Sequence, residues 1–252
     1  MKLLFVDIET CSITFKTTDI NDYDVVTEIG MVMCDTDYAT PKEPYPVVDM
    51  FSKIINCPNR PEMEKECLEI THLSEELVNN WGVVPNKQFC DFMAKCYFQK
   101  ADVIVASNGN NFDKPVLENF FAHYGSKLPD KLWIDIQRDI DYPGSCRNRN
   151  QTYLSGYHNI FNCLSHRSVT DCMTMAKIIG SFDTNGLLYP LDVIIENAKS
   201  PDVYVIAKVS FDNKDLAKND GFRWNPDTKQ WYKSMRQNQY SPDNYIFETE
   251  LG

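Results

Sequence analysis

Two acidic side chains follow a short apolar run near the start of the chain. Asp7 and Glu9 come directly after Leu3, Leu4, Phe5 and Val6. Alternate residues of an extended segment point to the same face, so the two carboxylates share a face. Like charges this close raise each other's pKa, and a bound cation relieves the repulsion. The pair therefore indicates a metal site, although two solvated acids at the end of a strand would give the same pattern.

Two further segments place an acid where a helix is expected to begin. Asp113 follows Ala106 to Phe112, and an Asp at this position is also explained by the helix dipole, which favours it by about 0.3–1 kcal/mol. His166 precedes Asp171 by five residues. These two side chains converge only if His166 lies on a loop and Asp171 lies in the first turn of the helix. A single His in such a loop is most often a surface residue.

Taken together, these residues suit one kind of chemistry. The carboxylates of Asp7, Glu9, Asp113 and Asp171 are hard oxygen ligands, which Mg²⁺ and Mn²⁺ prefer. Two such ions about 3.5–4 Å apart stabilise the attacking and the leaving oxygen of a phosphoryl displacement. A neutral imidazole, here His166, can take the proton from the attacking water. The set predicts hydrolysis of a phosphodiester bond.

The elements that must position these residues follow from the apolar pattern. Apolar segments predict five strands, at residues 3–6, 28–34, 47–55, 101–106 and 132–136. Helical spacing predicts helices at residues 62–68, from Ser74 onward, 86–99, 113–124 and 171–179. Short connections make the first three strands an antiparallel meander. The order predicts an α/β fold with a mixed five-stranded sheet and helices on its faces.

A break at Lys199, Ser200 and Pro201 predicts two domains, at residues 1–198 and 201–246. The second is expected to be a small α+β domain with a tryptophan-containing hairpin. Its basic residues alternate with Trp224, Trp231 and Tyr232, which could stack on bases. The alternative, which we favour from the sequence, is that both tryptophans form the core of so small a domain.

Charge and composition restrict the class of protein. The chain has 252 residues, a net charge of −11 and a pI of about 4.8, unlike a basic protein that coats nucleic acid. An enzyme that holds a few terminal nucleotides at bound cations is compatible with this charge. The nine cysteines form no CxxC pair, which predicts reduced thiols. The apolar run at the N-terminus is too short for a signal peptide or a membrane span, which predicts a cytoplasmic protein.

Three segments, FVDIET, ASNGNNFD and HRSVTD, resemble in this order the three exonuclease motifs of the DnaQ-like family, in its histidine-type DEDD branch. The resemblance covers roughly residues 1–180. It implies a ribonuclease-H-like fold, two Mg²⁺ or Mn²⁺ ions and release of nucleoside monophosphates from a 3' end. It also implies that Asp7, Glu9, Asp113 and Asp171 bind the metals and that His166 is the general base.

The resemblance also implies contacts to the substrate. Residues 70–75 resemble the family's segment that packs on the terminal nucleotide, and the implied substrate-binding residues are Thr10, His72, Leu73 and Asn108. Two departures concern substrate choice rather than chemistry. Ser107 stands where many members have His, and the acidic insertion between Glu9 and Glu28 could shape the substrate entrance.

The C-terminal segment is similar to a small domain appended to phage and plasmid nucleic-acid enzymes. This pairing implies a bacterial or phage-infected host cytoplasm, and it favours the 3' end of single-stranded DNA over RNA as the partner. Two alternatives remain open from the sequence. One is an exonuclease that acts on RNA ends, and the other is an inactive nuclease fold that serves as a binding module.

Overall fold

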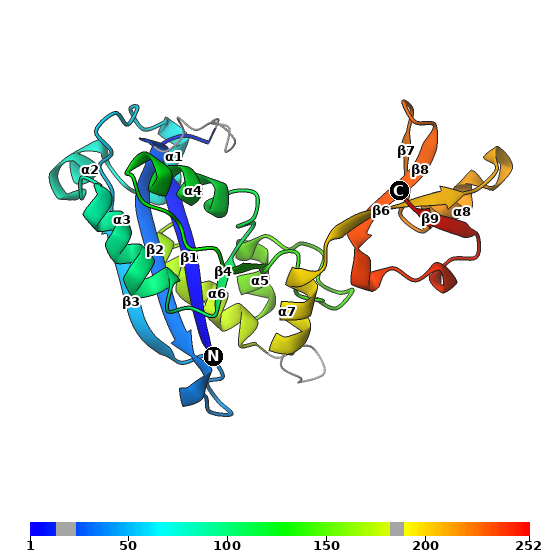
Figure 1. The fold of residues 1–252 in the computed structure, drawn as a ribbon, viewed down its shortest axis with the longest axis horizontal. Helices are drawn as coiled ribbons and strands as arrows, with labels where there is room; N and C mark the ends of the chain where they lie inside the picture. The colour runs from blue at the N-terminus through cyan, green and yellow to red at the C-terminus, as the bar shows by residue number, and fades with distance from the viewer. Residues whose placement is uncertain (14–23, 182–188) are drawn as a thin grey trace. The chain divides into compact units, whose positions relative to one another are not determined.

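Apolar segments between residues 2 and 135 pair into one sheet (Figure 1). In the computed structural model, which describes residues 1–13, 24–181 and 189–252, its strand order is β3-β2-β1-β4-β5. The strands are β1 (Lys2–Thr10), β2 (Val26–Asp35), β3 (Val47–Ile54), β4 (Val103–Ala106) and β5 (Leu132–Asp135). The first three are antiparallel neighbours, whereas β4 is parallel to β1 and β5 to β4. The predicted mixed five-stranded sheet and its antiparallel meander are confirmed.

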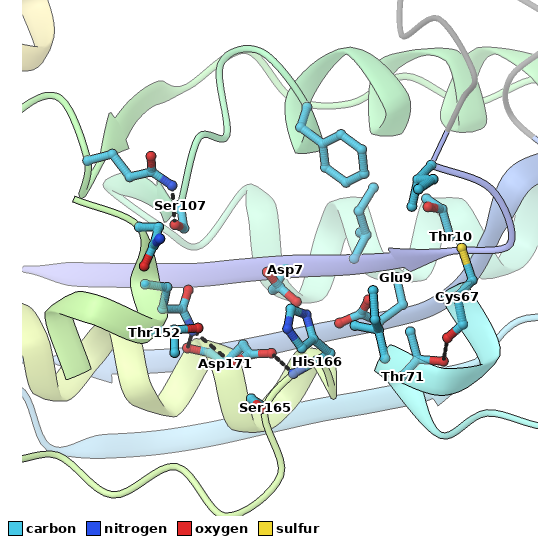
Figure 2. A pocket seen from close by; sticks show the side chains of 17 residues that line it. Asp7, Glu9, Thr10, Cys67, Thr71, Ser107, Thr152, Ser165, His166 and Asp171 are labelled. Atoms are coloured by element: carbon cyan, nitrogen blue, oxygen red, sulfur yellow. Dashed lines mark hydrogen bonds between the residues drawn. The ribbon is translucent and has the colours of Figure 1, made fainter. Parts of the chain in front are cut away.

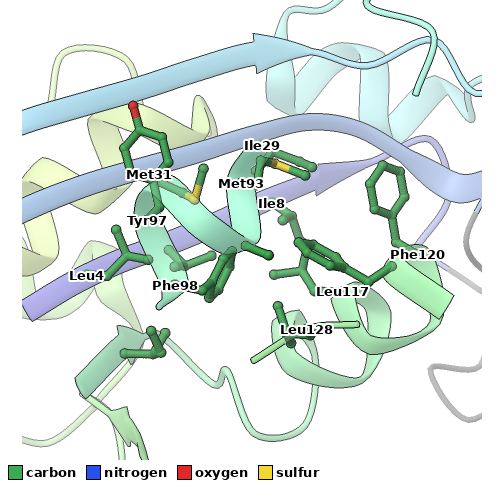
Figure 3. Packing of buried hydrophobic residues seen from close by; sticks show 14 of the residues in the cluster. Leu4, Ile8, Ile29, Met31, Met93, Tyr97, Phe98, Leu117, Phe120 and Leu128 are labelled. Atoms are coloured by element: carbon green, nitrogen blue, oxygen red, sulfur yellow. The ribbon is translucent and has the colours of Figure 1, made fainter. Parts of the chain in front are cut away.

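One face of this sheet carries the main apolar core. Leu4, Val6 and Ile8 alternate along β1 and pack with the side chains of two helices, α3 (Lys87–Met93) and α4 (Asp113–His123). A π-helical turn, Ala94–Phe98, continues α3 and adds Phe98 to the cluster (Figure 3). Full burial of each such side chain stabilises the fold by about 1.5–3 kcal/mol.

The other face of the sheet is covered by α6 (Ser168–Ile179), which packs on β1 and β2. Gly30 of β2 makes this possible. A Cβ atom there would lie 2.4 Å from the carbonyl carbon of Ser168 and 2.4 Å from the amide nitrogen of Val169. Only glycine permits so close an approach of two backbones. Because Asp7 lies opposite Gly30 in the sheet, this contact brings the start of α6 next to the acidic pair of β1.

Several helices agree with the expected positions. Ser74 caps α2 (Glu75–Trp81), and its Oγ accepts a hydrogen bond of 3.0 Å from the Leu77 amide. The first helix, α1 (Lys65–Thr71), starts three residues later than predicted, and α6 starts three residues earlier. The acidic insertion that was expected to shape the substrate entrance falls largely at residues 14–23, outside the described part of the chain.

Two helices were not predicted, α5 (Gln151–Tyr157) and α7 (Leu191–Lys199). The first is short and largely polar, so apolar spacing gave no signal for it. A capping residue marks its start, since the Asn150 side chain accepts a hydrogen bond from the Tyr153 amide at 2.8 Å. Contacts divide the chain into Met1–Ile194 and Ile195–Gly252.

The second unit contains a four-stranded sheet of order β7-β8-β6-β9 and a short helix, α8 (Lys214–Asn219). Its strands are β6 (Asp202–Lys208), β7 (Arg223–Asn225), β8 (Gln230–Arg236) and β9 (Glu248–Leu251). The last strand lies beyond the predicted end of the domain at residue 246. Trp231 packs against the core of this unit, but Trp224 is 48% exposed. The interpretation that both tryptophans form the core is therefore wrong for Trp224.

Two further expectations concern the chain as a whole. All nine cysteines are free thiols. Within the described ranges, no helix is both long enough and apolar enough to cross a membrane.

Candidate active site

Three of the predicted acidic residues meet at one cavity (Figure 2). Asp7 and Glu9 come from β1, and Asp171 comes from the first turn of α6. Each offers a carboxylate oxygen, and the three oxygens lie within 4.8 Å of one another. The cavity has a volume of about 470 Å³. Residues that are distant along the chain thus share one concave site.

His166 lies at the same cavity, and its main chain holds Asp171. The His166 amide donates a hydrogen bond of 2.7 Å to Oδ2 of Asp171. His166 has a left-handed backbone with a φ of 61°, two residues before α6 begins at Ser168. Figure 2 shows its imidazole beside Asp7 and Glu9. The expected arrangement, with His166 on the loop and Asp171 in the first helical turn, is present.

Two side chains that the sequence did not indicate hold the other oxygen of Asp171. Gln151 Nε2 and Asn162 Nδ2 each donate a hydrogen bond of 2.8 Å to Asp171 Oδ1. The capping residue Asn150 could have indicated a helix that begins at Gln151. A capping residue alone gives no reason to place Gln151 against Asp171. Together with the His166 amide, these donors fix the orientation of the Asp171 carboxylate.

Asp113 lies apart from the group of three. It is 2% exposed at the start of α4, and it does not line the cavity. Its Oδ1 accepts a hydrogen bond of 3.2 Å from the Ile8 amide, which lies between the two acids of β1. Its charge acts on both Asp7 and Glu9. The structure thus puts the fourth acid, buried, next to the acidic strand.

Burial and mutual repulsion make these carboxylates hard to ionise. The pKa of Asp7 is raised well above its ordinary value by burial and by Glu9, Asp113 and Asp171. Burial, followed by the charge of Asp171, raises the pKa of Glu9 to about 8, and burial raises that of Asp113 to about 8. The pKa of Asp171 is also raised, chiefly by burial. A divalent cation relieves such repulsion, and a cluster of carboxylate oxygens is the donor set that Mg²⁺ and Mn²⁺ prefer. The residues present therefore fit a divalent metal site.

A partly buried ion pair joins the residue before α6 to the sheet. Glu28 of β2 is 1% exposed, and its Oε1 accepts a hydrogen bond of 2.7 Å from Arg167 Nη2. Its Oε2 accepts another of 2.9 Å from the Ser168 amide. A buried carboxylate requires such donors. The sequence analysis missed both residues, although a Glu within an apolar strand was a usable signal.

The predicted substrate-binding residues are distributed differently. Thr10 lines the cavity, whereas Leu73 is fully buried in a separate apolar cluster. His72 is exposed at the end of α1, with a left-handed φ of 57°, and is not part of the cavity wall. From the same segment, Ile70 and Thr71 line the cavity instead. The segment therefore contributes to the cavity wall through Ile70 and Thr71, which come before the predicted residues His72 and Leu73.

Asn108 is exposed and does not line the cavity. Its amide donates a hydrogen bond of 2.9 Å to Asp135 Oδ1, so it has a role in the turn after β4. The neighbouring Ser107 does line the cavity, and its Oγ accepts a hydrogen bond of 2.9 Å from Gln137 Nε2. These two polar side chains form one end of the site.

Solved structures of exonucleases share this fold. The chain is similar to E. coli exonuclease I in complex with a dT13 oligonucleotide, at 14% identity and a TM-score of 0.54, over 70% of this chain and 40% of that one. It is similar to exonuclease X in complex with 5' overhanging duplex DNA, at 19% identity and a TM-score of 0.50, over 78% of this chain and 99% of that one. The nuclease domain of 3'hExo, a DEDDh family member bound to rAMP, matches at 17% identity and a TM-score of 0.52, over 70% and 88%.

At these identities the likeness is one of fold. The larger unit has the ribonuclease-H-like fold of these exonucleases, as predicted. The match spans about 40% of the exonuclease I chain. Residues 203–243 match a domain of unknown function, DUF8626. No curated protein matches the sequence of the chain.

Proposed function

We propose that the chain is a metal-dependent 3'–5' exonuclease that hydrolyses the terminal phosphodiester bond of single-stranded DNA. The observation that carries the proposal is the convergence of Asp7, Glu9 and Asp171 within 4.8 Å at a cavity of a fold shared with exonucleases. A buried group of acids without a cation is costly, and the raised pKa values of these carboxylates express that cost.

In this proposal Asp7, Glu9 and Asp171 hold divalent cations, and the buried Asp113 adds its negative charge next to β1. Bound Mg²⁺ or Mn²⁺ would supply an acidified water and neutralise charge on the phosphate oxygens. The donors on Asp171 leave its carboxylate little freedom to rotate, because Gln151 and Asn162 bond one oxygen and the His166 amide bonds the other. Such outer partners orient a ligand before the metal binds.

His166 acts as the general base. Its imidazole accepts a proton from the attacking water, whose oxygen forms a bond to phosphorus while the bond from phosphorus to the 3'-oxygen of the preceding nucleotide breaks. That 3'-oxygen leaves on the shortened strand, and the terminal nucleotide departs as a 5'-monophosphate. The left-handed backbone of His166 lets its amide bind Asp171 while its ring faces the cavity.

The apolar side of the cavity suits a nucleobase. Ile13, Ile70 and Phe112 line the cavity, and Ser107 and Gln137 add polar groups to its wall. An end-specific enzyme needs a wall for the last base and sugar, which these side chains provide. RNA is the second candidate substrate, because the similar 3'hExo domain is bound to rAMP.

Product analysis on end-labelled strands tests the proposal. DNA and RNA of the same sequence, labelled at the 5' end, are incubated with Mg²⁺, with the 3' hydroxyl either free or blocked by an inverted nucleotide. We expect a ladder that shortens from the free 3' end, faster for DNA, and protection by the block. Internal cuts, shortening from the 5' end, or intact strands of both kinds would contradict the proposal.

A further inference from the structure

The hairpin of the second unit leaves a large aromatic side chain half exposed. Trp224 of β7 lies opposite Trp231 of β8, with ring centroids 5.7 Å apart and an interplanar angle of 56°. Trp231 packs against the core of Val205, Ala207, Ala217 and Phe222. Trp224 remains 48% exposed, although so small a unit gains stability from every large apolar group that it buries.

Trp224 and Trp231 belong to a groove that other aromatic and basic side chains complete. The groove has a volume of about 450 Å³, and its walls include Phe211, Lys208 and Lys229. Phe211 is 80% exposed, and Lys214 Nζ lies 4.1 Å from the centroid of its ring. Lys229 is exposed in the hairpin turn, whereas Lys208 is paired with Glu250. Aromatic rings and ammonium groups thus lie at one groove.

The charge of this unit differs from that of the rest of the chain. Residues 195–252 contain eight Lys and Arg residues and nine Asp and Glu residues, within a chain whose net charge is −11. The larger unit therefore carries nearly all of the excess negative charge. A polyanion is repelled least by the second unit, and the lysines of the groove can contact its phosphates.

From these observations we propose that the groove between Phe211 and the tryptophan hairpin is a second binding site, for single-stranded nucleic acid. One base stacks on Trp224 or between Trp224 and Phe211, and Lys229 and Lys214 contact the adjoining phosphates. Stacking accepts any base, because every base has a π-face. An unpaired strand fits this groove better than a duplex, since duplex bases are already stacked on one another. The site is distinct from the acidic cavity. It does not require a strand end, so a closed circle can also bind there.

Binding of a circular oligonucleotide distinguishes this site from the exonuclease site. Binding of the full chain to a small, fluorescently labelled single-stranded DNA circle is measured by anisotropy in EDTA, where hydrolysis cannot occur. A circle offers no 3' terminus, so the result does not depend on the proposed exonuclease activity. We expect the native chain to bind the circle, with an affinity that falls as salt concentration rises.

Trp224→Ala should weaken binding of the circle by about tenfold or more, the order expected for the loss of one stacked base. Trp224→Phe should retain most of the affinity, because an aromatic face remains. Trp81→Ala is the matched control, since Trp81 is 76% exposed on α2 of the other unit, and its affinity should equal that of the native chain. Lys229→Glu, in an exposed turn, should weaken binding and reduce its salt dependence without removing any core contact.

Far-UV circular dichroism and thermal unfolding check that each variant is folded. If Trp224→Ala unfolds the second unit, Lys229→Glu decides the question alone. Failure of the native chain to bind the circle would overturn the proposal. So would native affinity in both Trp224→Ala and Lys229→Glu, which would mean that the circle binds elsewhere on the chain. A chain that binds the circle but digests no linear strand would support this site and contradict the exonuclease.

Discussion

The amide of His166 donates a 2.7 Å hydrogen bond to Oδ2 of Asp171, while the His166 imidazole lies at the cavity. The main chain and the side chain of His166 therefore have different roles. The main chain orients a carboxylate, and the side chain is available to a water molecule. This separation allows the role of the imidazole to be tested without disturbing Asp171.

Replacing His166 by Asn should slow hydrolysis by about 10²–10⁴-fold, the usual contribution of a general base. Asn is suited to this position because it tolerates the left-handed backbone with φ of 61°, and its amide can still bind Asp171. Single-turnover rates and substrate affinity measured separately check the prediction. Affinity should stay near the native value, and a native rate in the variant would exclude the imidazole as base.

Gln151→Ala should weaken Mn²⁺ binding by about 10–100-fold, because Gln151 bonds both the side chain and the carbonyl oxygen of Asp171. Gln137→Ala is the matched control. Gln137 lines the same cavity but bonds Ser107 instead. Isothermal titration calorimetry gives both affinities. Equal affinities in the two variants would mean that Gln151 does not position a metal ligand.

Arg167→Ala should destabilise the fold by about 3–5 kcal/mol, because it leaves the buried carboxylate of Glu28 without its cation. The comparison is Lys65→Ala, which breaks the exposed pair with Glu69 on α1 and should cost less than about 1 kcal/mol. Urea unfolding of both variants provides the two free energies. A cost for Arg167→Ala as small as that for Lys65→Ala would refute the assigned structural role.

The metal-free chain should lose stability as the pH rises from about 4 to about 8. The pKa of Glu9 rises from its ordinary 4.5 to about 8, and that of Asp113 from 3.8 to about 8. Between those values the folded chain retains protons that the unfolded chain has released, so the slope of stability against pH is negative. A Tm that rises over this range in EDTA would contradict the account.

Added Mn²⁺ should reverse this loss, and should raise the Tm more at pH 8 than at pH 5, because protons compete with the metal for the carboxylates at low pH. Glu9→Gln is the control for both effects. It removes one of the acids with a raised pKa, so both the pH dependence and the Mn²⁺ effect should be smaller.

Much of the larger unit could be predicted because most of its strands contain a run of apolar residues. Strand periodicity alone predicted that the carboxylates of Asp7 and Glu9 lie together, since residues two apart in a strand share a face. The placement of His166 before Asp171 followed from their spacing and the expected start of the helix. These features depend on local geometry, which a sequence expresses directly.

The remaining features depend on contacts between distant segments. Glu28 contacts Arg167 because Gly30 allows the backbone of α6 to pack closely on β2. No local sequence pattern predicts this packing. Leu73 was expected at the substrate, but the chain turns at His72 and directs Leu73 into an apolar cluster. Asp113 is held beside the acidic strand by its hydrogen bond to the Ile8 amide, a contact between segments far apart in the sequence that no local pattern indicates.

The proposed chemistry depends on the carboxylate of Asp7, which has the neighbouring acids around it and comes from the central strand of the sheet. The most direct test is the rate at which the native chain and Asp7→Asn release labelled mononucleotides from the 3' end of single-stranded DNA in Mg²⁺. We predict steady release by the native chain and a loss of at least about 10³-fold in the variant, with an unchanged or higher Tm in EDTA because an acid whose ionised form is disfavoured by burial has been replaced by a neutral amide. Equal release by the two proteins, or none by the native chain, would contradict the account.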